Sequence, residues 1–126
     1  MSKLNMFIKE YYDHSFDDWG GTTSEDYRTF ERKYKMILKE IGNEIGLDLY
    51  TFHKNHYEFS AVMKSRTEEK YCYISISDVR YWKNEWYSNI LYRTMAHATD
   101  WSGGHNRTCN LLELKDNLKS LMERGW

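Results

Sequence analysis

The sequence predicts an α+β domain in which an antiparallel sheet of three to four strands packs against two N-terminal helices and one C-terminal helix. Apolar residues recur every three or four positions at both ends of the chain, which is typical of amphipathic helices. Between residues 47 and 79 they alternate with polar residues, as in half-buried strands. At 126 residues, we expect a single domain spanning residues 1–126.

The two N-terminal helices are predicted from their apolar spacing. The first carries its apolar side chains at Leu4, Phe7, Ile8, Tyr11 and Tyr12 and is expected to end near a turn at residues 17–21. Ser24 can cap the second helix. The apolar positions of that helix are Tyr27, Phe30, Tyr34, Ile37, Ile41 and Ile45. Gly42 and Gly46 are expected to loosen its end.

Three short strands are predicted next, at residues 47–54, 56–64 and 70–79, with polar turns between them. Such short neighbouring strands favour an antiparallel meander. The side chains expected to share a face within the second and third strands are Phe59, Ala61 and Met63, and Cys72, Ile74 and Ile76.

The last third of the chain predicts a fourth strand, a loop and a helix. The strand is expected at residues 90–94, and residues 96–109 are polar and glycine-rich, as in a loop. Asn110 and Glu113 have the spacing of a capping box at the start of the closing helix. The apolar stripe of that helix is Leu111, Leu114, Leu118 and Leu121.

Composition and charge exclude some classes of protein. Eighteen basic and nineteen acidic residues give a formal net charge of -1, which argues against a generic nucleic-acid binder. The sequence contains no signal-peptide pattern and no apolar stretch of membrane-spanning length, so we expect a cytoplasmic protein without a membrane partner. In that compartment Cys72 and Cys109 are expected to be free thiols.

Basic residues along the second predicted helix form the first candidate site. Spacings of four, three and four residues place four cations on one side of the helix: Arg28, Arg32, Lys35 and Lys39. Such a ridge could bind phosphates or a carboxylate-rich protein surface. The alternative is an ordinary solvated helix face, partly balanced by pairing of Glu31 with Lys35.

The segment from Arg93 to Arg107 is the second candidate. It collects His97, Asp100, Trp101, Gly103, Gly104, His105 and Asn106 between those two arginines. In a binding loop the glycines would let backbone N–H groups approach an anion or a base, while the other side chains make the partner contacts. In a structural loop the same glycines form a turn, Trp101 anchors it and Asp100 caps backbone groups. Both interpretations remain open at this stage.

Metal binding and catalysis have weak support. His97, His105 and Cys109 can be drawn as zinc ligands, as can the short pair His53 and His56, but no C-x-x-C or H-E-x-x-H motif accompanies them. No nucleophile elbow, Walker loop or dinucleotide fingerprint occurs. We therefore expect no metal, no cofactor and no enzymatic activity.

The C-terminal half resembles small proteins from phages and mobile elements of Firmicutes. The similar segments are residues 77–80, 86–87 and 90–94, followed by Asp100 to Asn106, within the pattern R-T-x-x-x-x-x-D-[WY]-[ST]-G-G-x-N. Trp101 stands where Tyr is equally usual. The resemblance implies a role among inhibitors of host defence, which include anti-CRISPR proteins.

Three hypotheses of function follow. The leading one is a non-enzymatic inhibitor that binds a bacterial defence nuclease, such as an RNA-guided effector, or the complex of that nuclease with nucleic acid. The second is a module for single-stranded nucleic acid, with a tyrosine-rich sheet as the stacking platform and the ridge at residues 28–39 as the backbone contact. The third is an enzyme that acts on a small molecule through the glycine loop.

Overall fold

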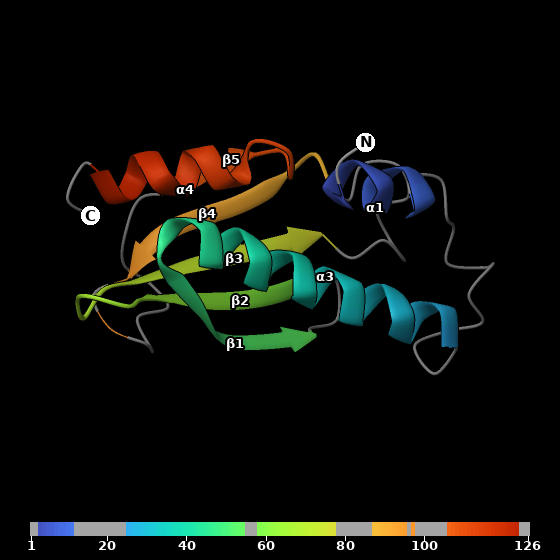
Figure 1. The fold of residues 1–126 in the computed structure, drawn as a ribbon, viewed down its shortest axis with the longest axis horizontal. Helices are drawn as coiled ribbons and strands as arrows, with labels where there is room; N and C mark the ends of the chain where they lie inside the picture. Colours follow the sequence, from blue (N-terminus) through green and yellow to red (C-terminus); the bar gives the residue numbers. More distant parts are fainter. Residues whose placement is uncertain are drawn as a thin grey trace.

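A five-stranded antiparallel sheet, with the helices over one of its faces, organises the chain in the computed structural model (Figure 1). The structure describes residues 3–11, 25–54, 58–77, 87–95, 97 and 106–123. Within them the elements are α1 (Lys3–Tyr11), α3 (Glu25–Ile45), β1 (Leu47–Lys54), β2 (Glu58–Ser65), β3 (Tyr71–Ser77), β4 (Ile90–Met95), β5 (Arg107–Cys109) and α4 (Leu114–Glu123). The predicted α+β class is confirmed.

The sheet has the order β1-β2-β3-β4-β5, so strands that follow one another in the sequence are neighbours in space. All four pairings are antiparallel, which confirms the predicted meander. In the register Met63 lies opposite Cys72, and Ile74 lies between Ala61 and Tyr92. These side chains share the face that carries the helices.

The number of strands was predicted wrongly, because β5 lies inside the segment expected to be a loop. β5 is only three residues long, and it pairs with Ile90, Leu91 and Tyr92 of β4. Three residues are too few to show the alternation that identifies a strand. The backbone of β4 supplies the hydrogen-bonding partner that the local sequence cannot reveal.

The core lies between the sheet and the three described helices. Its central rings are Phe30 and Tyr34 of α3, which are fully buried. Phe7 of α1 stacks on Phe30 with 5.4 Å between ring centroids, and Phe30 contacts Phe59 of β2 at 6.1 Å. Burying each such ring contributes about 1.5–3 kcal/mol. This aromatic cluster therefore fixes α1 against α3 and α3 against the sheet.

The helix at residues 25–45 matches its prediction, and its two glycines have different roles. Gly46 has a φ of 83°, in the left-handed region that ends helices. Gly42 lies within the helix, and a Cβ there would stand 2.5 Å from the carbonyl oxygen of Leu47 and 2.7 Å from Cε of Met63. Gly42 therefore allows α3 to approach the sheet closely, rather than loosening the helix.

Capping at the start of α4 is confirmed. The backbone N–H of Glu113 donates to Oδ1 of Asn110 at 3.0 Å, and the N–H of Asn110 donates to Oε1 of Glu113 at 3.3 Å. The predicted apolar stripe of this helix is buried at all four leucines. Ser24 and the turn predicted at residues 17–21 lie outside the described residues. No helix in the described part of the chain has the length and apolarity needed to cross a membrane.

Candidate interaction surfaces

The basic stripe on α3, defined by Arg28, Arg32, Lys35 and Lys39, is fully on the solvent side of the helix. All four residues are exposed, whereas the opposite face of α3 buries Phe30, Tyr34 and Leu38. The guanidinium of Arg32 donates to Oγ1 of Thr29 at 3.1 Å. The stripe therefore presents four positive charges on a helix whose position is fixed by the core.

An apolar groove, called the helix groove below, runs between α1 and α3. It has a volume of about 500 Å³, and its apolar lining is Met6, Phe7, Met36 and Ile37. Met6 and Met36 are each 57% exposed. Most large apolar side chains of the described residues are buried, so two exposed methionines on facing helices mark this groove as a candidate binding surface.

Two ion pairs connect α1 to α3 across the helix groove. Nζ of Lys3 lies 2.8 Å from Oε1 of Glu40, and Nζ of Lys33 lies 3.1 Å from both carboxylate oxygens of Glu10. The hydrogen bond that Lys33 donates to the Glu10 carboxylate raises the pKa of Lys33. Such exposed pairs contribute only about 0–1 kcal/mol each. Their main effect here is to neutralise the charges that border the groove.

The helix groove continues past the Lys3–Glu40 pair into a second depression of about 340 Å³. Leu112, in the turn before α4, lines this depression and is 48% exposed. At its far end Nζ of Lys115 lies 2.9 Å from Oε2 of Glu44. The two depressions share the walls formed by Lys3, Ile37 and Glu40. Together they follow α3 over much of its length.

A third surface, the tyrosine face, lies on the side of the sheet away from the core. Because Met63 and Cys72 face the helices, the adjacent opposed pair Lys64 and Tyr71 must project to the other side. The residues of this surface are Tyr50, Tyr71, Tyr73 and Lys64. Tyr50 is 54% exposed, and its ring centroid lies 5.7 Å from that of Tyr71. A tyrosine-rich sheet face is therefore present, but the ridge at residues 28–39, predicted as its backbone contact, belongs to α3 over the opposite face of the sheet.

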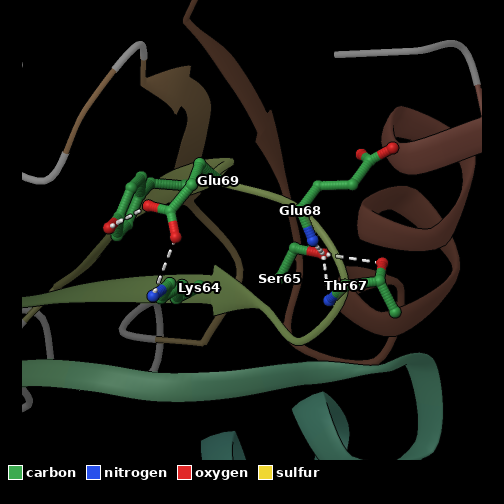
Figure 2. Close-up of polar contacts among 6 residues, drawn as sticks. Lys64, Ser65, Thr67, Glu68 and Glu69 are labelled. Carbon is green, nitrogen blue, oxygen red and sulfur yellow. Dashed lines mark hydrogen bonds and ion pairs between the residues drawn. The ribbon is translucent and has the colours of Figure 1, made fainter.

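The β2–β3 turn holds one edge of the tyrosine face in place (Figure 2). Oγ of Ser65 accepts hydrogen bonds from the backbone N–H groups of Thr67 and Glu68, both at 3.3 Å. This turn brings Glu69 to 3.4 Å from Nζ of Lys64, and the hydroxyl of Tyr71 donates to the Glu69 carboxylate at 3.3 Å. The negative charge of Glu69 raises the pKa of Lys64.

Arg93 lies within β4, on the same side of the sheet as the tyrosine face. Its guanidinium carbon stands 4.9 Å from the centroid of the Tyr73 ring, and its Nη1 donates to the carbonyl oxygen of Thr94 at 3.2 Å. Only 6% of the residue is exposed. Arg93 therefore contacts neighbouring parts of this chain over most of its surface, and it presents little area for a partner.

Much of the predicted glycine loop falls outside the described residues, including Asp100, Trp101, Gly103, Gly104 and His105. Among its other members His97 and Asn106 are exposed, and Arg107 is half-buried in β5 opposite Tyr92. The proposed clustering of these side chains around a ligand stays a prediction.

Both cysteines are free thiols. Cys72 in β3 and Cys109 in β5 are separated by β4, and two strand spacings amount to about 10 Å. A disulfide needs Cα atoms within about 7 Å. Burial raises the pKa of Cys72 to about 12 and also raises the pKa of the half-buried Cys109. Neither thiol therefore has the lowered pKa of a reactive nucleophile.

No group of three metal-ligating side chains occurs among the described residues. His97 and Cys109 belong to that part of the chain, whereas His56 and His105 do not. Each zinc arrangement drawn from the sequence includes one of these two undescribed residues, so both stay predictions.

The helix groove was not predicted from the sequence, although the sequence carries a signal for it. On the helical projection of α3, Met36 falls between the basic stripe and the apolar positions Tyr34 and Ile37. Met36 therefore extends the apolar surface of the helix beyond the face that packs on the core. Met6 does the same on α1, beside Phe7. Two such displaced methionines on helices that pack together indicate a groove between them.

Comparison with known protein families, curated proteins and solved structures finds no match to this chain.

Proposed function

We propose that this chain is a non-enzymatic inhibitor of a bacterial defence nuclease and that it binds its target through the exposed side of α3. The observation that supports this best is that the basic stripe adjoins the helix groove, so that charge and exposed apolar area occur on one surface. Protein interfaces combine an apolar centre with a charged rim in this way.

A protein partner fits this surface better than nucleic acid does. Phosphates would interact with the stripe, but they would leave Met6 and Met36 in water. A protein can cover both methionines and also place carboxylates beside Arg32 and Lys39. Covering exposed apolar area adds about 25 cal/mol per Å² before the costs of association.

The choice of a defence nuclease as the target comes from the resemblance of residues 77–106 to small proteins of phages and mobile elements. Small proteins of that origin that lack catalytic motifs are often inhibitors of host defence. An inhibitor of this kind needs a rigid surface that blocks a nucleic-acid channel or a conformational step. The face of α3 has that rigidity because its buried side is fixed by the aromatic core.

The test is a phage-infection assay in bacteria that carry an active RNA-guided nuclease, combined with co-purification of that nuclease with the tagged chain. We expect the chain to protect the phage and to retain the nuclease. The charge-reversed variant Arg32→Glu/Lys39→Glu should lose both properties. Lys9→Glu/Lys119→Glu, a double reversal at exposed positions of α1 and α4 that do not line the helix groove, is the matched control and should keep them. Full protection by the α3 variant would contradict the proposed binding surface.

A second candidate function is binding of single-stranded nucleic acid on the tyrosine face. The specific observation in its favour is the adjacency of Tyr50 and Tyr71, with Nζ of Lys64 lying 5.8 Å from the centroid of the Tyr71 ring. Rings beside a cation can stack bases and attract phosphates, and each stacked base contributes about 1–3 kcal/mol.

A fluorescence titration with labelled oligothymidylate tests this second candidate. Binding that weakens with salt, and that Tyr71→Ala reduces about tenfold or more, would support it. Arg32→Glu/Lys39→Glu is the matched comparison, because it alters a surface on the opposite side of the sheet. Absence of salt-sensitive binding would remove the candidate.

A further inference from the structure

We propose that the helix groove and the basic stripe together receive an acidic amphipathic helix of the target protein. This inference rests on the proposed function and adds the chemistry of the partner segment. The observation that supports this inference is the position of the basic stripe, which lies along only one side of the apolar groove.

The length of the groove suits a helix. Its walls extend along α3 from Lys33 to Glu44, and the eleven steps between these residues span about 16 Å, or three turns. The exposed apolar side chains along it are Met6, Met36 and Leu112. A docked helix of the same length would contact them with apolar residues at positions i, i+4 and i+7. Methionine side chains adapt to such partners because they are unbranched and flexible.

The charges around the groove decide which helix fits. At its borders Lys3 pairs with Glu40 and Lys33 pairs with Glu10, so the groove itself is close to neutral. The basic stripe lies beyond Met36 on the side away from α1. Arg32 is one turn before Met36 and Lys39 is about one turn after it, so any side chain placed over Met36 has cations beside it. A docked helix therefore gains from carboxylates on that flank.

Other occupants match this surface less well. The phosphates of a nucleic-acid strand would interact with the basic stripe, but the strand would leave the methionines exposed. A basic amphipathic helix would cover the methionines but would place like charges beside Arg32 and Lys39, which is unfavourable. An acidic amphipathic helix covers the methionines and also places carboxylates beside Arg32 and Lys39.

The experiment uses a fluorescein-labelled synthetic helix of about four turns, with Leu at i, i+4, i+7 and i+11 and Glu along one flank. Two matched probes replace every Glu by Lys, or every Leu by Ser. Fluorescence anisotropy with the full chain should show binding of the acidic Leu probe and at least about tenfold weaker binding of the other two. Met36→Glu should weaken binding of the acidic Leu probe by a similar factor.

Tyr50→Glu is the control variant, because it introduces the same charge at an equally exposed position on the other side of the sheet. Met36→Glu itself lies at an exposed helical position, so it should fold, and circular dichroism checks this. The inference is overturned if the Lys probe binds as well as the Glu probe. It is also overturned if Met36→Glu has no effect, or if light scattering shows that Met36 instead mediates association of two copies of this chain.

Failure of this inference and failure of the proposed function can be separated. If no probe binds the groove, but the chain still protects the phage through Arg32 and Lys39, the helical partner is wrong and the inhibitor function stands. If the acidic probe binds as expected and the chain gives no protection, the binding chemistry stands and the inhibitor function is wrong.

Discussion

Lys33 of α3 holds Glu10 of α1 symmetrically, with its Nζ 3.1 Å from each carboxylate oxygen. The same ammonium group lies 5.5 Å from the centroid of the Tyr11 ring. The pair therefore connects the end of α1 to α3 at one edge of the helix groove. The aromatic core determines that α1 packs on α3, and this pair helps to set how closely the two helices approach at the surface.

A double-mutant cycle on this pair gives the first prediction. Glu10→Gln and Lys33→Gln, alone and combined, should reveal a coupling free energy of about 0.3–1 kcal/mol in urea unfolding at low salt, because both side chains are about half exposed. The coupling should decrease in about 1 M salt, where charges on the surface are screened. A coupling that does not change with salt would mean that the pair is not an electrostatic contact.

The two glycines at the end of α3 give the second prediction. Gly42→Ala should lower the free energy of unfolding by about 1–3 kcal/mol, because the new methyl group meets the backbone of Leu47. Gly46→Ala should lower it by about 1 kcal/mol through its positive φ alone, since nothing lies within 4 Å of a Cβ there.

Matched variants separate these two causes. Gly46→Asn should recover part of the loss, because Asn tolerates the left-handed region, whereas Gly42→Asn should be at least as harmful as Gly42→Ala. Lys39→Ala, at an exposed position of the same helix, should stay within about 0.5 kcal/mol of the parent chain. Equal stability of Gly42→Ala and the parent chain would show that α3 lies too far from β1 for the new methyl group to meet the backbone of Leu47.

Capping of α4 gives the third prediction. Asn110→Ala should cost about 1 kcal/mol of unfolding free energy, because it removes the acceptor for the N–H of Glu113. Asn110→Ser keeps a capping oxygen and should remain close to the parent chain. If both variants are equally destabilised, the loss has another origin than the cap.

The buried thiol of Cys72 gives the fourth prediction, which concerns pH. Burial raises the pKa of Cys72 from 9.0 to about 12, so the folded chain keeps this proton while the unfolded chain loses it above pH 9. The contribution of Cys72 to stability is therefore complete below pH 9 and declines as the pH rises towards 12. Between pH 8 and pH 10 it should fall by about 1 kcal/mol.

Urea unfolding of the parent chain and of Cys72→Ala at both pH values isolates this effect. The variant should be less stable at pH 8 because it has lost core contacts, but it should lose less stability than the parent chain on going to pH 10. Buried Tyr34 also has a raised pKa, but it is present in both proteins and cancels in the comparison. An identical pH dependence of the two proteins would contradict the proposed burial of the thiol.

Elements with a regular pattern could be predicted from the sequence. The apolar spacing of residues 25–45 and the alternation in β2 and β3 both reflect burial on one face, so the pattern and the structure have the same cause. The cap formed by Asn110 and Glu113 could also be predicted, because its two hydrogen bonds depend only on residues three positions apart.

Features that arise from contacts between distant segments could not be predicted in the same way. β5 is a strand because β4 offers its backbone, and the three residues Arg107–Cys109 carry no pattern of their own. The helix groove exists because α1 packs on α3, which brings Met6 beside Met36. The four cations of the basic stripe were found from their spacing, but the groove next to them required the packing of the two helices.

Oxidative footprinting of methionines in a complex with the proposed target, a defence nuclease, tests most directly whether that target binds at the helix groove. In the free chain Met6 and Met36 should react rapidly, because each is 57% exposed, whereas Met63 is fully buried and should react slowly. The account predicts that the nuclease protects both Met6 and Met36. Equal oxidation of these two residues with and without the nuclease, in a complex shown to be intact, would contradict it.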